Sequence, residues 1–219
     1  KASVTGIRPL RALLCAMVIA GCMLPADADA APGLIHAGTS ATASGDSSIA
    51  YGYGAKAKKD HSIAQGTGAD AEEEYALAMG YKATAKGLQS LAIGRQANAK
   101  GANSIAAGAG AKGYAKDGVA IGNNAESGTA TGKDPRIPAI DSDNGVAVGN
   151  SAKASGGSSV SVGNDSIGSG PSSVAIGNAA TANDVRTTAI GNNAHAEGAG
   201  SLSIGREASA LTLENATST

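Results

Sequence analysis

The sequence predicts an all-β protein, a parallel β-roll solenoid of about twelve coils with 14 residues each. The first observation is a five-residue pattern (small, bulky aliphatic, small, aliphatic, Gly) that recurs at this fixed spacing, and such a period is the signature of a repeat architecture. The second is a composition without Trp or Phe, so the core must be thin, as in a solenoid whose repeats pack only on their neighbours. The glycine of the pattern occurs at Gly52, Gly66, Gly80, Gly94, Gly108, Gly122, Gly149, Gly163, Gly177, Gly191 and Gly205.

The first thirty residues have the layout of a secretory signal. Basic side chains precede an apolar run over residues 12–24, and an A-x-A cleavage site ends at Ala30. The apolar run is short for a transmembrane helix. We expect cleavage after Ala30; the alternative is a lipoprotein box that ends at Cys22, which would then be lipidated. Either route takes the chain out of the cytoplasm.

The strand that ends at the repeat glycine is predicted to be buried on both faces. Its alternation of period two indicates a β-strand, and none of its eleven copies contains a charged residue. One assignment places the bulky side chains inside the roll and the small residues against other copies of the chain. We infer the first assignment; the reverse one, with small residues inside and aliphatic residues between chains, also demands partner chains, and the sequence alone does not separate the two. Under the first assignment the interface between chains contains Ser104, Ala106, Ala120, Ala147, Ser159, Ser173, Ala175 and Ala189.

The strand after the glycine is predicted to face solvent. Ala lies three residues after the glycine in ten of the eleven copies, followed by a mostly polar residue and then a small one, as in residues 55–57. This alternation indicates small side chains inside and polar ones outside. In the following turn Lys58, Glu72 and Lys86 are 14 residues apart and should stack on successive coils, in surface pairs worth about 0–1 kcal/mol each.

The repeat is interrupted once, where the spacing between two glycines rises to 27 residues. Gly, Pro and Asp predict a turn-rich loop over about residues 128–144. A long loop on a rigid scaffold is a candidate contact site, and the alternative is a tolerated insertion in a solenoid turn. Its charged candidates are Lys133, Asp134 and Arg136. The repeats should span residues 31–210, and residues 211–219 form a tail or the start of a missing region.

The residue types argue against catalysis, cofactors and bound metal. His36, His61 and His195 occur in different coils at different phases of the repeat, so they predict no metal cluster. The serines repeat at a structural position without His or a carboxylate beside them, which excludes a catalytic triad. The net charge of −1 gives no electrostatic argument for nucleic acid or an anionic membrane as partner. We therefore expect a protein that is not an enzyme.

Strands such as residues 173–178 (Ser-Val-Ala-Ile-Gly-Asn), repeated every 14 residues with Ala three after the Gly, resemble the head repeats of YadA-like trimeric autotransporter adhesins. The resemblance covers about residues 35–210. It implies a left-handed parallel β-roll, a homotrimer, and a place on the outer membrane of a Gram-negative bacterium. It also implies binding to a host extracellular matrix protein such as collagen, or to a host cell receptor. The family's binding motif is matched best, with two departures, by residues 103–108, which makes Asn103 and Ser104 candidate partner contacts.

The function expected from this resemblance is that of a bacterial cell-surface adhesin head. Contact with a membrane would be made only through an anchor outside this chain. The alternative is a structural or ice-binding secreted β-solenoid. Ice-binding faces need regular outward columns of Thr, whereas the outward column here is mixed, with Lys56, Asp70 and Thr84 in succession.

Overall fold

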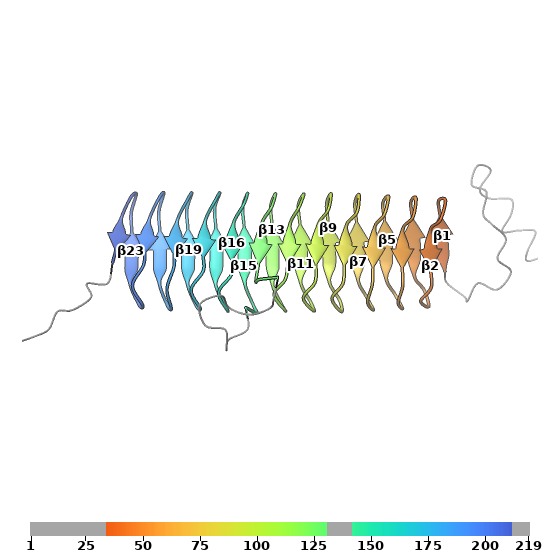
Figure 1. Cartoon of the computed structure of the whole chain (residues 1–219), viewed down its shortest axis with the longest axis horizontal. Helices are drawn as coiled ribbons and strands as arrows, with labels where there is room; N and C mark the ends of the chain where they lie inside the picture. The colour runs from red at the N-terminus through yellow and green to blue at the C-terminus, as the bar shows by residue number, and fades with distance from the viewer. Residues whose placement is uncertain (1–33, 131–141, 212–219) are drawn as a thin grey trace, which may run out of the picture. The chain divides into compact units, whose positions relative to one another are not determined.

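The protein is a stack of twelve coils, each made of two short strands and two turns (Figure 1). The computed structural model describes residues 34–130 and 142–211. The expected signal segment with Cys22, the centre of the insertion and the last eight residues lie outside the described residues. Within the described ranges all regular structure is β, so the predicted all-β solenoid of about twelve coils is confirmed.

Each sheet runs the length of the stack and contains one strand from every coil. Sheet A contains β1 (Ile35–Ala37), β3 (Ile49–Tyr51), β5 (Ile63–Gln65), β7 (Leu77–Met79), β9 (Leu91–Ile93), β11 (Ile105–Ala107), β13 (Val119–Ile121), β15 (Val146–Val148), β17 (Val160–Val162), β19 (Val174–Ile176), β21 (Thr188–Ile190) and β23 (Leu202–Ile204). Sheet B contains β2 (Thr42–Ala43), β4 (Lys56–Ala57), β6 (Asp70–Ala71), β8 (Thr84–Ala85), β10 (Asn98–Ala99), β12 (Lys112–Gly113), β14 (Glu126–Ser127), β16 (Lys153–Ala154), β18 (Ile167–Gly168), β20 (Thr181–Ala182), β22 (His195–Ala196) and β24 (Ser209–Ala210).

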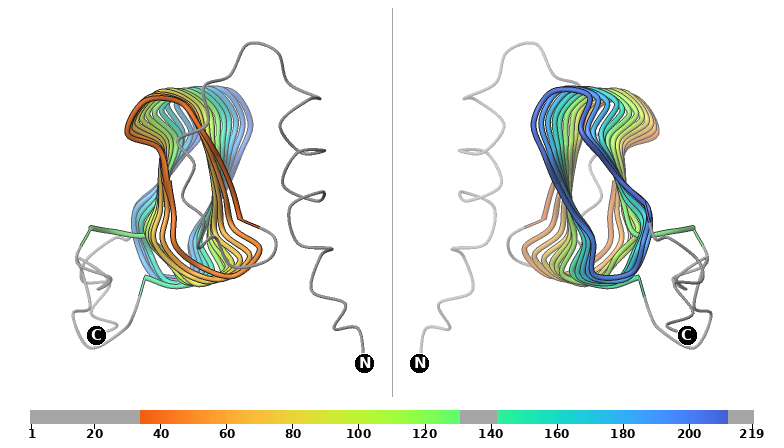
Figure 2. Two further views of the ribbon diagram at one scale, coloured as in Figure 1. Left: turned by 90° about the vertical axis from the view of Figure 1, so that its right-hand side faces the viewer. Right: turned by 90° about the vertical axis from the view of Figure 1, so that its left-hand side faces the viewer.

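The parallel register places equivalent residues of successive coils side by side. Ala106 pairs with Ala120, which in turn pairs with Ala147 across the insertion. Figure 2 looks along the stack and shows the coils following one another closely. Each position of the repeat therefore forms a column that runs along the stack, and the insertion leaves these columns unbroken.

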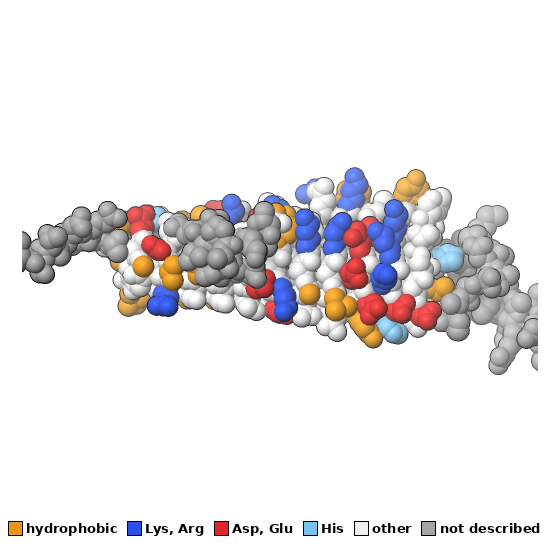
Figure 3. All heavy atoms as spheres, turned by 60° about the horizontal axis from the view of Figure 1, so that its bottom comes forward, with side chains coloured by type: hydrophobic (Ala, Val, Ile, Leu, Met, Phe, Trp, Pro, Cys, Tyr) orange, Lys and Arg blue, Asp and Glu red, His pale blue; other side chains and the backbone are white. Residues whose placement is uncertain are grey.

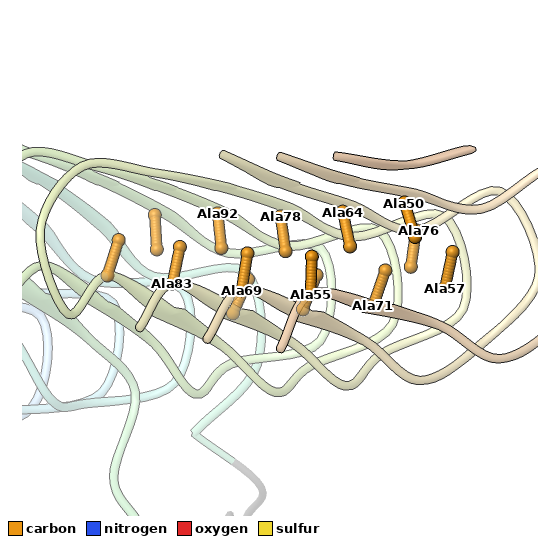
Figure 4. Close-up of a cluster of buried hydrophobic side chains, with 14 of the residues drawn as sticks. Ala50, Ala55, Ala57, Ala64, Ala69, Ala71, Ala76, Ala78, Ala83 and Ala92 are labelled. Carbon is orange, nitrogen blue, oxygen red and sulfur yellow. The ribbon is translucent and has the colours of Figure 1, made fainter. Parts of the chain in front are cut away.

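The interior is filled by small side chains, and this corrects the first of the two assignments above. The alanines of the buried columns of both sheets, such as Ala64 and Ala71, point into the space between the sheets and have no exposed surface (Figure 4). All eight residues predicted at an interface between chains are likewise 0% exposed within a single chain: Ser104, Ala106, Ala120, Ala147, Ser159, Ser173, Ala175 and Ala189. The prediction that they contact other chains is wrong.

The physical reason is the short distance between the two sheets. The hydroxyl oxygens of Ser161 and Ser166, on opposite sides of the core, are 2.7 Å apart and share a hydrogen bond. A Cβ atom added to Gly113 would lie 3.2 Å from Cβ of Ser104. Sheets that carry large side chains stack about 10 Å apart, and here the largest fully buried side chain is Thr187. The aliphatic side chains of sheet A therefore point outward, as the reverse assignment has it.

Candidate interaction surfaces

The outward side of sheet A is a largely apolar face, in which Gln65 and Thr188 are the polar members among the described strands. We call "the apolar face" the outward side chains of its strands, which are the first and third residue of each strand. The first residues are half-buried in all but the two end strands, and the third residues include Tyr51 (57% exposed), Ile121 (43%), Ile176 (39%) and Ile204 (63%). Twelve strands at the usual spacing give a stripe about 50 Å long. A contiguous apolar surface on a water-exposed protein marks an interaction site.

The outward side of sheet B is polar and carries a ladder of ion pairs, as the sequence predicts. Nζ of Lys58 lies 3.4 Å from a carboxylate oxygen of Glu72, which is also 3.0 Å from Nζ of Lys86. Partial burial alone would raise the pKa of Glu72, but its hydrogen bonds and ion pairs with Lys86 and Lys58 outweigh burial and lower it. Burial alone would lower the pKa of Lys58, and the pairs with Asp70 and Glu72 raise it instead.

Removing the charge of this ladder should have a small, pH-dependent effect. Glu72→Gln is expected to reduce the free energy of unfolding by less than about 1 kcal/mol, because the pairs are solvent-exposed. Because the pKa of Glu72 is lowered in the folded state, its contribution is complete above the ordinary value of 4.5 and is lost as the pH falls through the folded value. The denaturation midpoints of Glu72→Gln and of the unmodified chain should therefore differ at neutral pH and converge at about pH 3.

The matched control for this prediction is Glu73→Gln. Glu73 is exposed, and no ion pair involves it among the described residues. The prediction would be contradicted if the two substitutions lowered the free energy of unfolding equally, or if the loss for Glu72→Gln persisted in acid.

The residues predicted to contact a partner differ in where the structure places them. Asn103 is exposed on a turn, and its Nδ2 donates a 2.7 Å hydrogen bond to Asp117 of the next coil. Ser104 is fully buried beside it, so the prediction that Ser104 touches a partner is wrong. Asn103 lies in the turn, whereas Ser104, the residue before β11, turns into the core. The loop candidates Lys133, Asp134 and Arg136 lie outside the described residues.

Sequence reasoning missed a group of exposed aromatic side chains. Tyr51, Tyr53, Tyr75 and Tyr81 are between 47% and 63% exposed, and the ring of Tyr75 stacks on His61 at 4.9 Å between centroids. All five tyrosines of the chain lie between residues 51 and 114. Their exposure could have been expected from their positions in the repeat, which fall in turns and on the outward side of sheet A. Aromatic residues are enriched at the centres of protein interfaces.

A shallow depression on sheet B has a volume of about 450 Å³. Its lining mixes charges of both signs and contains no histidine or cysteine: Lys112, Asn124, Glu126, Ser151, Lys153, Asp165 and Ile167. Within residues 34–130 and 142–211, no three His, Cys, Asp or Glu side chains gather where they could hold a metal ion. No helix in the same ranges is long and apolar enough to cross a membrane.

The comparison with protein families agrees with this geometry. The model described as YadA head domain repeat (2 copies) matches residues 37–55, 57–83, 85–111, 142–166, 169–194 and 185–208, together more than half of the chain. No curated protein sequence matches the chain at a significant level. The matched segments lie on coils seen in the structure and leave residues 112–141, which include the insertion, unmatched. The chain therefore belongs to the family of YadA-like trimeric autotransporter adhesin heads.

Proposed function

We propose that the chain is the head of an adhesin on the outer membrane of a Gram-negative bacterium, where it attaches the cell to host extracellular matrix or to host cells. The family is surface-exposed and adhesin-like, and its heads are typically not enzymes. The fold suits this role, because a rod of stacked coils presents long surfaces in place of a single pocket. The localisation, the export signal and the host ligand belong to the proposal.

The observation that best supports this function is the apolar face of sheet A. Single chains in water rarely expose such a stripe, so we propose that three copies cover it by packing side by side in a homotrimer. The polar side of sheet B and the turns stay exposed in such an assembly. Binding of a collagen-like matrix protein or a cell receptor then falls to those outward surfaces, which include Asn103 and the insertion with Lys133, Asp134 and Arg136.

The test is a panel of immobilised matrix proteins and host cells, probed with the purified full chain. A second protein lacks residues 129–141, which restores the 14-residue spacing between the flanking coils. Saturable binding to at least one matrix protein or cell type is expected. Loss of binding on deletion assigns the contact to the insertion, and unchanged binding assigns it to the coils. Absence of saturable binding by the intact, correctly assembled chain would refute the attachment function.

A further inference from the structure

The charges of the stack are distributed unevenly, although they nearly cancel over the whole chain. Residues 75–116, which form three coils, contain six Lys or Arg and no Asp or Glu. Residues 142–211 contain three basic and five acidic side chains. Figure 3 shows one face of the stack, on which charged side chains gather over the N-terminal coils. A net charge of −1 therefore conceals a strongly basic segment.

Five of these cations lie on sheet B or in the turns at its edges; we call Lys82, Lys86, Arg95, Lys100 and Lys112 the basic band. Lys112 is on β12, whereas Lys86 and Lys100 directly follow β8 and β10. Because equivalent positions of neighbouring coils pair in register, Lys86 and Lys100 leave the sheet about 5 Å apart. Four of the five are exposed, and Lys112 keeps 43% of its side chain exposed.

The band is only partly neutralised within the chain. Lys86 pairs with Glu72 at 3.0 Å and Lys112 with Glu126 at 3.4 Å, both at the margins of the three coils. Lys82, Arg95 and Lys100 have no carboxylate within 4.0 Å in the described part of the chain. Like charges held this close repel one another, so an anion that binds among them stabilises the folded chain.

The neighbours of the unpaired cations suit a polysaccharide. Nζ of Lys82 lies 5.3 Å from the ring centre of Tyr81, and Nζ of Lys100 lies 5.0 Å from that of Tyr114. A tyrosine ring offers an apolar face beside a hydroxyl group, which matches the mixed surface of a sugar ring. The column of sheet B between the cations adds the hydroxyl of Thr84 and the amide of Asn98.

We propose that the basic band binds a linear sulfated polysaccharide of the glycosaminoglycan type. Successive coils present cations at the strand spacing along one direction, so a repeating polyanion engages several of them at once and gains from multivalency. The choice of an extracellular polyanion rests on the proposed surface display. The band lies on sheet B and its edges, whereas the apolar face is the outward side of sheet A, so assembly through sheet A leaves the band accessible.

The experiment measures binding of the full chain to immobilised heparin at increasing salt. The variant Lys82→Gln/Arg95→Gln/Lys100→Gln removes the three unpaired cations. The control Lys59→Gln/Lys153→Gln/Arg206→Gln removes the same charge from positions outside the band that make no ion pair in the described structure. At about 150 mM salt the band variant should bind about tenfold or more weakly, with a shallower salt dependence, while the control stays within about twofold.

Several results would overturn this inference. They are absence of heparin binding by the unmodified chain, equal loss in both variants, equal binding of desulfated heparin, and equally tight binding of duplex DNA. Circular dichroism of each variant checks that its fold is intact. The same preparations are tested on the matrix panel. Attachment to a matrix protein without heparin binding removes only the glycan inference, and heparin binding without attachment removes only the proposed protein ligand.

Discussion

Replacing Gly108 by alanine is expected to lower the free energy of unfolding by about 3 kcal/mol or more. Gly108 has φ of 139°, a backbone conformation that residues with a Cβ atom rarely adopt. A Cβ at this position would lie 2.2 Å from the carbonyl oxygen of Gly122 in the next coil and 2.6 Å from its carbon. The contact is with backbone, so relief requires the two coils to move apart and weakens their hydrogen bonds.

Substitutions at two other glycines separate the cost of backbone strain from the cost of the contact with the next coil. Gly205 has φ of 128°, but the nearest atom to its added Cβ is 3.8 Å away, so Gly205→Ala reports backbone strain alone. Gly54 has φ of 64° with nothing within 4 Å of its Cβ, and Lys82 and Gln96 occupy the equivalent position in later coils. Gly54→Ala should therefore cost about 1 kcal/mol.

Chemical denaturation followed by circular dichroism, at one protein concentration, measures all three variants. The expected order of destabilisation is Gly108→Ala, then Gly205→Ala, then Gly54→Ala. If Gly108→Ala and Gly54→Ala unfold at the same denaturant concentration, the coils do not stack through the glycine column.

This glycine column also explains why so much of the fold is predictable from the sequence. Every coil has a glycine at the same place, Gly38 in the first coil and the eleven repeat glycines in the others, so the period is visible without knowledge of any contact. The strand after the glycine is equally clear: Lys56 is exposed between the buried Ala55 and Ala57, as its alternation predicts. Repeat number, strand pairing and the outward side of sheet B follow from these local rules.

The orientation of sheet A did not follow, because neither of its faces carries charge. The sequence did contain a signal in its exceptions. The column at Ala64 is Ala or Ser in all eleven copies, whereas the next column admits Tyr51 and Gln65, which suit an outward side. Hydrophobicity alone favours the bulky residues as core, but the volume between sheets that approach as closely as Ser161 and Ser166 decides against them.

The turns contain a second feature that composition did not indicate. Each coil except the last has at least two residues with φ between about 50° and 75° in the described structure, and most of them are not glycine, for example Tyr75, Lys82 and Arg186. None of the non-glycine residues in this conformation is Val, Ile or Thr, whose branching at Cβ makes the left-handed region costly. The candidate contact Asn103 is one of these residues, so its outward direction depends on turn geometry that a strand pattern cannot supply.

The largest expected effect on assembly comes from placing charge on the apolar face. Ile121→Lys/Ile176→Lys should convert the proposed homotrimer, whose mass would be three times the 21.0 kDa of the chain, into monomers or disordered aggregates. Each isoleucine is about two-fifths exposed in the single chain, so covering it contributes about 1 kcal/mol. A lysine buried in its place adds a desolvation cost of several kcal/mol, repeated in every copy.

The matched control for this prediction is Asn98→Lys/Thr181→Lys, which adds the same charge to the outward side of sheet B. That column already contains Lys56, Lys112 and Lys153, so each coil should accept it and the mass should not change. Light scattering coupled to size exclusion, over a range of micromolar concentrations, measures the mass of all three proteins. A folded monomer for the unmodified chain, or dissociation by the control alone, would refute assembly through sheet A. Dissociation by the isoleucine variant alone would place the apolar face between the chains and leave sheet B and the turns as the surfaces available to a ligand.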